Sequence, residues 1–167
     1  MTSYRIIETK LGFIGVAGRN GKLLRSTLPK STREMAFDAV REGLDASAVE
    51  DEAGFDGLAG KLRTYAEGAK VDFSDVPVDV QAYGLFHRAA LSACRRIPHG
   101  QVASYRDVAR AAGSEKACRA VGTAMAGNRT PIVIPCHRVI ASGGRIGGFS
   151  TDLEWKRDLL RLEGVDI

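Results

Sequence analysis

The sequence predicts an α+β fold in two parts: a small β-sheet with flanking helices over residues 1–80, and a mostly helical part over residues 81–167. Apolar residues alternate between glycine-containing turns near the N-terminus, which is typical of short strands. Later segments repeat apolar residues at helical spacing. The charge also changes near residue 80. The first part holds eleven Lys and Arg against thirteen Asp and Glu, a net charge of −2, and the second holds thirteen against seven, a net charge of +6.

The first part begins with three expected strands, at residues 3–9, 11–17 and 22–28. Gly12 and the stretch GRNG at 18–21 supply the turns between them. Strands joined by such short turns pair with their neighbours, so we expect a β-meander.

Two helices are expected to flank this sheet. The first can be capped by Ser31 or Thr32 and runs to about residue 43. The second covers about 55–67, where apolar residues recur at helical spacing. The remaining stretches are predicted to be a loop at 45–54, which is acidic, and a linker at 70–80, which contains a proline and three aspartates.

The second part opens with a helix over about 81–96, whose apolar residues include Leu85. Two short helices are expected at 104–112 and 115–126, with Ser114 as the cap of the second. Helix, short glycine-containing turn, helix is the pattern of a helix-turn-helix. Together with the positive charge it is compatible with a nucleic-acid partner, and equally with an ordinary basic helical domain.

The segment that follows is apolar at residues 132–134 and is expected to be an extended strand that ends at Pro135. A glycine-rich loop comes next, with GGRIGG at 143–148, which lacks the spacing of a phosphate-binding motif. The last helix is expected at about 152–163, and its final residue, Glu163, would ordinarily be a surface carboxylate.

Composition excludes several classes of protein. An apolar share of 44% is typical of a folded chain rather than a disordered one. Three cysteines without a CxxC pair predict free thiols in a reducing compartment. The N-terminal MTSYRIIETK lacks the apolar stretch of a signal peptide, and no run approaches 18 apolar residues, so no membrane span is expected. The three His and three Cys show no zinc-like spacing, so we expect no metal.

Cys136 is the candidate for chemistry, because His137 and Arg138 follow it directly and Pro135 precedes it. Neighbouring cations and hydrogen-bond donors favour the reactive thiolate. In extended chain Cys136 and His137 would point to opposite faces, so a bridging water would have to connect them. The same residues are also compatible with a buried, inert cysteine beside a surface histidine.

The second helix of the pair has small residues and one cationic side. Lys116, Arg119 and Thr123 lie at i, i+3 and i+7, between alanines. Such a helix can approach DNA closely, with Arg119 entering the base stack, although a solvated helix face would have the same pattern.

Three stretches together resemble the O6-alkylguanine-DNA alkyltransferase family, also called methylated-DNA–protein-cysteine methyltransferases. GNRTPIVIPCHRVI is similar to the active-site signature, IPHGQVASYRDVARAAGSEKACRAVGTAMAGN to the helix-turn-helix, and GGFSTDLEWKRDLLRLEG to the closing loop and helix. They cover about residues 80–164. The resemblance implies a ribonuclease-H-like N-terminal domain over 1–80 and a C-terminal domain of winged helix-turn-helix type over 81–167.

The resemblance also implies roles for matching residues. Cys136 would be the nucleophile and final alkyl acceptor, and Glu163 would polarise His137, which acts on Cys136 through a water. Asn128 would brace the active-site turn and His137. Tyr105 would donate a hydrogen bond to the departing base.

Further residues would surround the substrate and the DNA. Arg119 would fill the space left by a flipped nucleotide, Lys156 would hold the loop to the active site, and Ser150 would contact O6. The other implied contacts are Phe149, Val139 and Met125 to the substrate and Lys116, Ala117, Ala120, Gly122 and Thr123 to DNA. Phe149 stands where many members have Tyr, Thr151 where many have Gly, and Cys118 where a small Ala-like residue is usual.

The implied activity is DNA repair by suicide transfer. A thiolate attacks the alkyl carbon, and the thioether product has no carbonyl for water to attack, so each molecule would act once and without a cofactor. The implied partner is double-stranded DNA containing O6-alkylguanine, bound by a monomer in the cytoplasm, at the nucleoid, or in a nucleus. Two alternatives stay open: a DNA-damage-recognition or regulatory module that transfers nothing, and a cysteine hydrolase using Cys136, His137 and Asn128.

Overall fold

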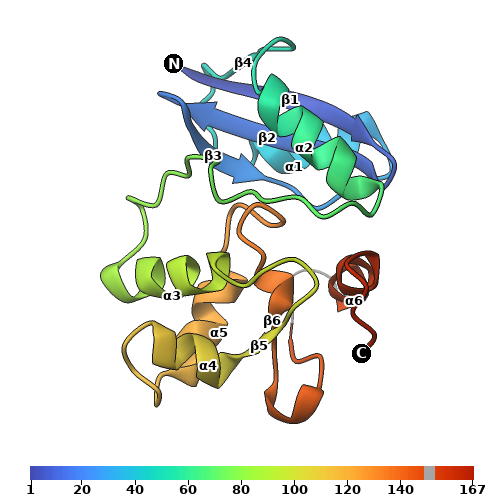
Figure 1. Cartoon of the computed structure of the whole chain (residues 1–167). Helices are drawn as coiled ribbons and strands as arrows, with labels where there is room; N and C mark the ends of the chain where they lie inside the picture. The colour runs from blue at the N-terminus through green and yellow to red at the C-terminus, as the bar shows by residue number, and fades with distance from the viewer. Residues whose placement is uncertain (149–152) are drawn as a thin grey trace. The chain divides into compact units, whose positions relative to one another are not determined.

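The computed structural model describes residues 1–148 and 153–167, and the chain divides into two compact units, Met1–Asp79 and Val80–Ile167 (Figure 1). The first unit is a sheet with two helices and the second is mostly helical, so the predicted α+β class is confirmed. Among the described residues, no helix has the length and apolar character needed to cross a membrane.

The sheet of the first unit has four strands in the order β3-β2-β1-β4 (Figure 1). Strands β1 (Thr2–Thr9) and β2 (Gly12–Arg19) pair antiparallel, and β2 pairs antiparallel with β3 (Lys22–Ser26), so the predicted meander is confirmed. Gly12 is required at its turn: its φ is +129°, and a Cβ there would lie 2.5 Å from the carbonyl oxygen of Lys30.

Strand β4 (Val49–Glu50) contradicts the prediction of a loop throughout 45–54. It pairs parallel with the start of β1, with Ser3 opposite Val49. Both of its residues are exposed, so it lacks the alternation of buried and exposed side chains by which a strand is recognised in sequence.

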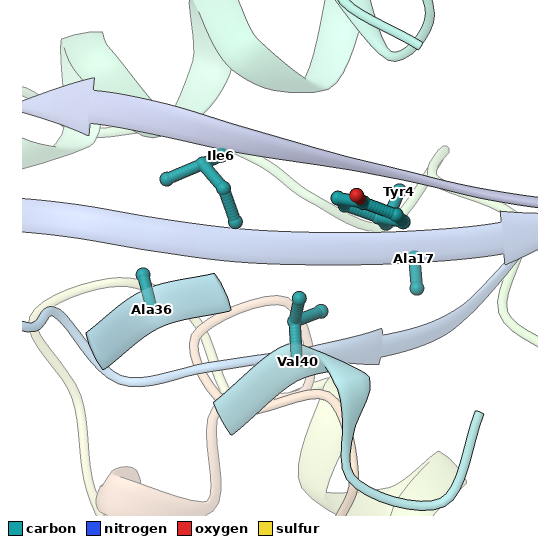
Figure 2. Packing of buried hydrophobic residues seen from close by; sticks show 5 residues of the cluster. All are labelled: Tyr4, Ile6, Ala17, Ala36 and Val40. Atoms are coloured by element: carbon teal, nitrogen blue, oxygen red, sulfur yellow. The ribbon is translucent and has the colours of Figure 1, made fainter. Parts of the chain in front are cut away.

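Helices α1 (Arg33–Arg41) and α2 (Asp56–Ala66) cover opposite faces of the sheet (Figure 1). Thr32 is the cap of α1, because its hydroxyl accepts a hydrogen bond from the Met35 amide at 3.1 Å. In Figure 2 the α1 side chains point toward those of β1 and β2. The buried residues of this cluster are Tyr4, Ile6, Ala17, Ala36 and Val40.

The stretch 70–80 packs against the sheet instead of forming a free linker. The Leu23 amide donates to the Pro77 carbonyl and the Asp79 amide to the Leu23 carbonyl, each at 2.8 Å. Phe73 is buried. The prediction therefore erred here, because the segment covers backbone groups of the edge strand β3 that would otherwise face solvent.

The second unit contains three helices that pack on one another: α3 (Leu85–Arg95), α4 (Tyr105–Ala111) and α5 (Cys118–Ala126). Helix α4 begins with a capping box, in which Ser104 and Asp107 each bind the other's backbone amide at 3.0 Å. Helices α4 and α5 are joined by a short turn around Gly113, as the helix-turn-helix prediction requires.

Helix α3 begins four residues later than predicted. The Tyr83 amide closes a turn onto the Val80 carbonyl, and Gly84 is extended, which delays the helix. Leu85 consequently stands at the first helical position with 83% of its surface exposed and contributes nothing to the core.

Helix α5 also begins later than predicted, because residues 114–117 form a separate turn in which the Ala117 amide donates to the Ser114 carbonyl. Ala117 is the N-cap and provides no side-chain hydrogen bond, so the prediction that Ser114 caps this helix is wrong. Lys116 precedes the helix rather than lying on its face.

The apolar run before Cys136 is a turn, not the expected strand. The Ile134 amide donates to the Thr130 carbonyl at 2.9 Å, and Ile132 adopts a φ of 73°. All three isoleucine and valine side chains at 132–134 are buried by this turn, which explains why a continuous apolar run is found outside a strand.

Five further elements lie in the described part of the second unit. Strand β5 (Ala103–Ser104) pairs parallel with β6 (Val139–Ile140). The 3₁₀ helices are η1 (Cys136–Arg138) and η2 (Ser142–Gly144). Helix α6 (Leu153–Leu162) comes last, close to its predicted position.

Gly15 tests the packing of α1 on β2. A Cβ at Gly15 would lie 2.7 Å from the Val40 Cβ and 2.9 Å from the Ala36 carbonyl oxygen. Gly15→Ala is therefore expected to lower the free energy of unfolding by about 1–3 kcal/mol through overpacking. The control is Gly60→Ala, at an exposed and open position inside α2, which should raise it by about 0.5–1 kcal/mol. Urea unfolding followed by circular dichroism measures both, and equal effects would contradict this packing.

Candidate active site

Cys136 is held at the start of the 3₁₀ turn η1 by hydrogen bonds from both sides. Its amide donates to the Ile134 carbonyl at 2.8 Å, and the Asn128 side-chain amide donates to the same carbonyl at 2.9 Å. The Asn128 oxygen in turn accepts from the amide and the hydroxyl of Thr130. Asn128 therefore holds the backbone of the Cys136 turn through the Ile134 carbonyl, while its expected contact with His137 stays a prediction.

The Cys136 thiol is buried, with only 5% of the residue exposed. Burial raises its pKa above the ordinary value for a thiol, and a hydrogen bond with Asn128 and the nearby Lys156 ammonium oppose that rise only in part. At neutral pH the resting group is therefore the thiol, and a reaction that needs the thiolate also needs a proton acceptor.

His137 follows Cys136 in the sequence and lies fully buried next to Glu163. Its Nε2 is 2.8 Å from the Glu163 Oε1. Burial lowers the pKa of His137, so the imidazole is neutral at rest. An ionised carboxylate only accepts hydrogen bonds, so Nε2 carries the hydrogen and the lone pair is on Nδ1.

Glu163 is not the surface carboxylate that its position at a helix end suggested. Its side chain is fully buried, and it also accepts hydrogen bonds from the Arg138 guanidinium and from the Gly100 amide. Although burial opposes ionisation, the hydrogen bonds from His137 and Arg138 hold the pKa of Glu163 far below its ordinary value. The carboxylate therefore stays charged.

Tyr105 and Lys156 meet at the loop before α6. The Tyr105 hydroxyl and the Lys156 Nζ both donate to the Gly148 carbonyl, at 3.1 and 2.9 Å. Burial raises the pKa of Tyr105, which keeps its hydroxyl protonated as a donor, and lowers the pKa of Lys156 to about 8. Gly147 is needed here, because its φ is +73° and a Cβ would lie 3.0 Å from the Tyr105 ring.

The predicted DNA-contacting residues lie on and before α5. Arg119, Ala120 and Thr123 are exposed on one side of the helix, and a Cβ added at Gly122 would point into open space. The opposite side, which includes Met125, is buried. Lys116 and Ala117 lie in the preceding turn.

Of the remaining predicted substrate contacts, the structure describes Val139 but not those in the stretch 149–152. Val139 is buried and pairs with Ala103 in the short sheet. Phe149, Ser150 and Thr151 lie outside the described residues.

Arg138 was expected from sequence to favour the Cys136 thiolate, which is wrong because Arg138 pairs with Glu163 and burial raises the pKa of Cys136. Cys94 was given no role at the site. Arg138 is buried and ion-paired with Glu163, and Cys94 is a second buried thiol whose pKa is raised well above its ordinary value by burial. The charge next to Cys136 was a signal for Arg138, but a long cationic side chain is ordinarily exposed. Cys94 had no local signal beyond its helical position.

Within residues 1–148 and 153–167 there is no group of three or more His, Cys, Asp or Glu side chains arranged to hold a metal ion.

The chain is similar to known proteins over nearly its whole length. Residues 85–165 match the family model described as "6-O-methylguanine DNA methyltransferase, DNA binding domain". The methylated-DNA–protein-cysteine methyltransferase of Mycolicibacterium paratuberculosis is 32% identical over 163 residues, which cover 98% of this chain and 93% of the relative. The protein of the same name from Methanopyrus kandleri is 48% identical over 104 residues, covering 62% of this chain and 76% of the relative.

Solved structures agree with these sequence relatives. The crystal structure of Mycobacterium tuberculosis OGT in complex with DNA superposes with a TM-score of 0.79 at 29% identity, covering 97% of this chain and 93% of that one. The O6-methylguanine methyltransferase of the same organism gives a TM-score of 0.78 at 31% identity, covering 98% and 93%.

Glu163→Gln tests the buried ion cluster. It leaves Arg138 without its anionic partner, so we expect the free energy of unfolding at pH 7 to fall by about 3–5 kcal/mol. Because the folded-state pKa of Glu163 is depressed, its contribution is present above pH ~4.3, the ordinary value, and is lost as the pH falls. In urea titrations, the free energy of unfolding of the variant should therefore fall less between about pH 5 and 2 than that of the unchanged chain.

Glu67→Gln, which changes an exposed carboxylate at the end of α2, is the control and should alter stability by less than about 0.5 kcal/mol. Similar small effects of both substitutions would show that Glu163 makes no important ion pair.

Proposed function

This chain belongs to the methylated-DNA–protein-cysteine methyltransferase family, and from that membership we propose that it repairs DNA by taking the alkyl group of O6-alkylguanine onto the sulfur of its own Cys136. The observation that carries the proposal is the position of a buried thiol on a braced turn beside a buried His–Glu pair. These residues lie inside the region that matches the family model.

The proposed reaction begins with loss of the Cys136 proton. Since the buried group rests as a thiol, the neutral His137 accepts this proton through a water, and the Glu163 carboxylate stabilises the imidazolium that forms. The sulfur then attacks the alkyl carbon. A carbon–sulfur bond forms as the bond between that carbon and the guanine O6 breaks.

The leaving group needs a proton as it departs. Guanine leaves as an anion unless its ring is protonated, and we assign this proton donation to the Tyr105 hydroxyl, which is kept protonated by burial. The imidazolium of His137 holds the proton released by Cys136. When it gives that proton up to water and the Tyr105 tyrosinate takes one from water, the net change is one proton moved from Cys136 to guanine. The product thioether has no carbonyl for water to attack, so one chain acts once.

The base must leave the duplex before its alkyl carbon can be reached. We assign this step to the exposed side of α5, with Arg119 filling the gap from the minor groove. The positive charge of residues 81–167 supports binding to the phosphates, which should weaken with added salt. We expect a monomer to act on double-stranded DNA containing O6-alkylguanine, in the cytoplasm of a prokaryote or the nucleus of a eukaryote.

Transfer to Cys136 is tested by the mass of the intact protein after incubation with duplex DNA containing O6-methylguanine. We expect one added methyl group per chain, on the peptide that holds Cys136, and none for Cys136→Ala, which should still bind the DNA. Cys118→Ala should still accept the group. A methylated Cys136→Ala chain would exclude this acceptor, and DNA binding by the unchanged chain without any mass gain would indicate a damage-recognition module.

The role of Arg119 is tested by comparing two substrates. Extrusion of a base costs a few kcal/mol, so Arg119→Ala should slow transfer from duplex DNA by about 10–100-fold. Transfer from the free O6-alkylguanine base needs no extrusion and should keep its rate. Arg157→Ala removes an exposed cation from α6 as the matched control. Equal slowing on both substrates would place Arg119 in the chemistry rather than in base flipping.

A further inference from the structure

The buried guanidinium of Arg138 donates most of its hydrogen bonds to one carboxylate, that of Glu163. Its Nε lies 2.9 Å from Oε2 and 3.2 Å from Oε1 of Glu163, and its Nη2 lies 2.8 Å from Oε1. Its Nη1 donates to the Ile97 carbonyl at 2.7 Å. Only 6% of the residue is exposed, so this pair is shielded from solvent.

The same carboxylate is the partner of His137, which makes the net charge of the cluster important. With a neutral imidazole, Arg138 and Glu163 already balance each other. Protonation of His137 would leave a net positive charge buried in the protein, which is costly. Without Arg138 the protonated form of His137 would be favoured over the neutral imidazole, because an imidazolium would then neutralise the buried Glu163.

We propose that Arg138 is a positioning residue that keeps His137 a neutral imidazole by neutralising Glu163, so that His137 remains able to accept the Cys136 proton. The proposal rests on the function proposed for Cys136 and His137. Arg138 acts through Glu163 and needs no contact with the alkyl group. Its second role is geometric, because its bonds to Glu163 and Ile97 fix the carboxylate oxygen that orients the imidazole.

The other cation near His137 also disfavours its protonation, and the nearby thiols are too weakly ionised to favour it. Lys156 on α6 is a second cation that disfavours the imidazolium, and it is charged below pH ~8. The thiols of Cys136 on η1 and Cys94 on α3 are protonated over that range, since burial raises the pKa of each. Glu163 is the anion that favours protonation of His137, so its neutralisation decides the charge of the imidazole.

The test compares Arg138→Met, which removes the cation, with Arg138→Lys, which keeps the charge but has fewer donors. Nuclear magnetic resonance of ¹⁵N-labelled histidine in the full chain reports the titration of His137, assigned by loss of its signals in His137→Gln. In Arg138→Met we expect the titration to rise by at least about one pH unit. In Arg138→Lys it should stay near that of the unchanged chain.

Single-turnover transfer rates provide the second measurement. Arg138→Met should transfer the group about tenfold more slowly at pH 6 than at pH 8. This factor is counted after division by the corresponding ratio for the unchanged chain. The double variant Arg138→Met/Glu163→Gln removes both charges and should return the titration of His137 to low pH. Should Arg138→Met fail to fold, Arg138→Gln removes the cation, retains a hydrogen-bond donor and takes its place.

An unchanged His137 titration in a folded, cation-free variant would overturn the proposal, as would an equal shift in Arg138→Lys. A purely structural role would lower the melting temperature without moving the titration. Because the resonance measurement requires no alkyl transfer, a shift of the His137 titration in a chain that transfers nothing would reject the proposed function and support the electrostatic role of Arg138.

Discussion

The buried carboxylate of Glu163 is the interaction around which the second unit is organised. It stands at the end of α6 and accepts hydrogen bonds from His137 and Arg138 of η1 and from the Gly100 amide. Arg138 extends the connection to the Ile97 carbonyl, just beyond α3. One charge therefore joins three segments that are distant in sequence. A buried charge is tolerated only when it is paired and hydrogen-bonded, so these segments must be in place together.

The burial that makes this cluster rigid also determines the chemistry of Cys136. A thiol kept protonated by its surroundings is a poor nucleophile until a base removes its proton, and it is correspondingly slow to react with solutes that encounter the free protein. For a protein that uses its acceptor once, such protection has a clear advantage. In the proposed reaction the thiolate forms only when His137, whose pKa is lowered by burial, has accepted the proton.

Sequence predicted those features whose cause is local. The capping of α1 and the glycine turn of the first hairpin depend on neighbouring residues, and both were visible in the pattern, although the choice of Thr32 over Ser31 as the cap came from the structure. Strand β4 was missed because its two exposed residues pair with a distant strand. The apolar residues 132–134 were misinterpreted because burial of a turn and burial of a strand require the same side chains.

The residues of the candidate site show the same difference between local and distant causes. Cys136 and His137 are adjacent in sequence and could be proposed from their chemistry, whereas Glu163 lies 26 residues from His137 and looked like a surface carboxylate. The role of Glu163 in the site was implied by the family resemblance alone. The ion pair of Arg138 with Glu163 was not identified by either route, because nothing in one chain's sequence says that a cation is buried against an anion that the fold brings to it.

A short stretch of chain connects the exposed side of α5 with the acceptor. The helix ends at Ala126, and Asn128, two residues later, holds the Ile134 carbonyl that also receives the Cys136 amide. Displacement of α5 would therefore move the brace of the Cys136 turn directly. Since the helix that would contact DNA ends two residues before the residue that braces the Cys136 turn, we expect docking on DNA and alignment of the thiol to be coupled rather than independent.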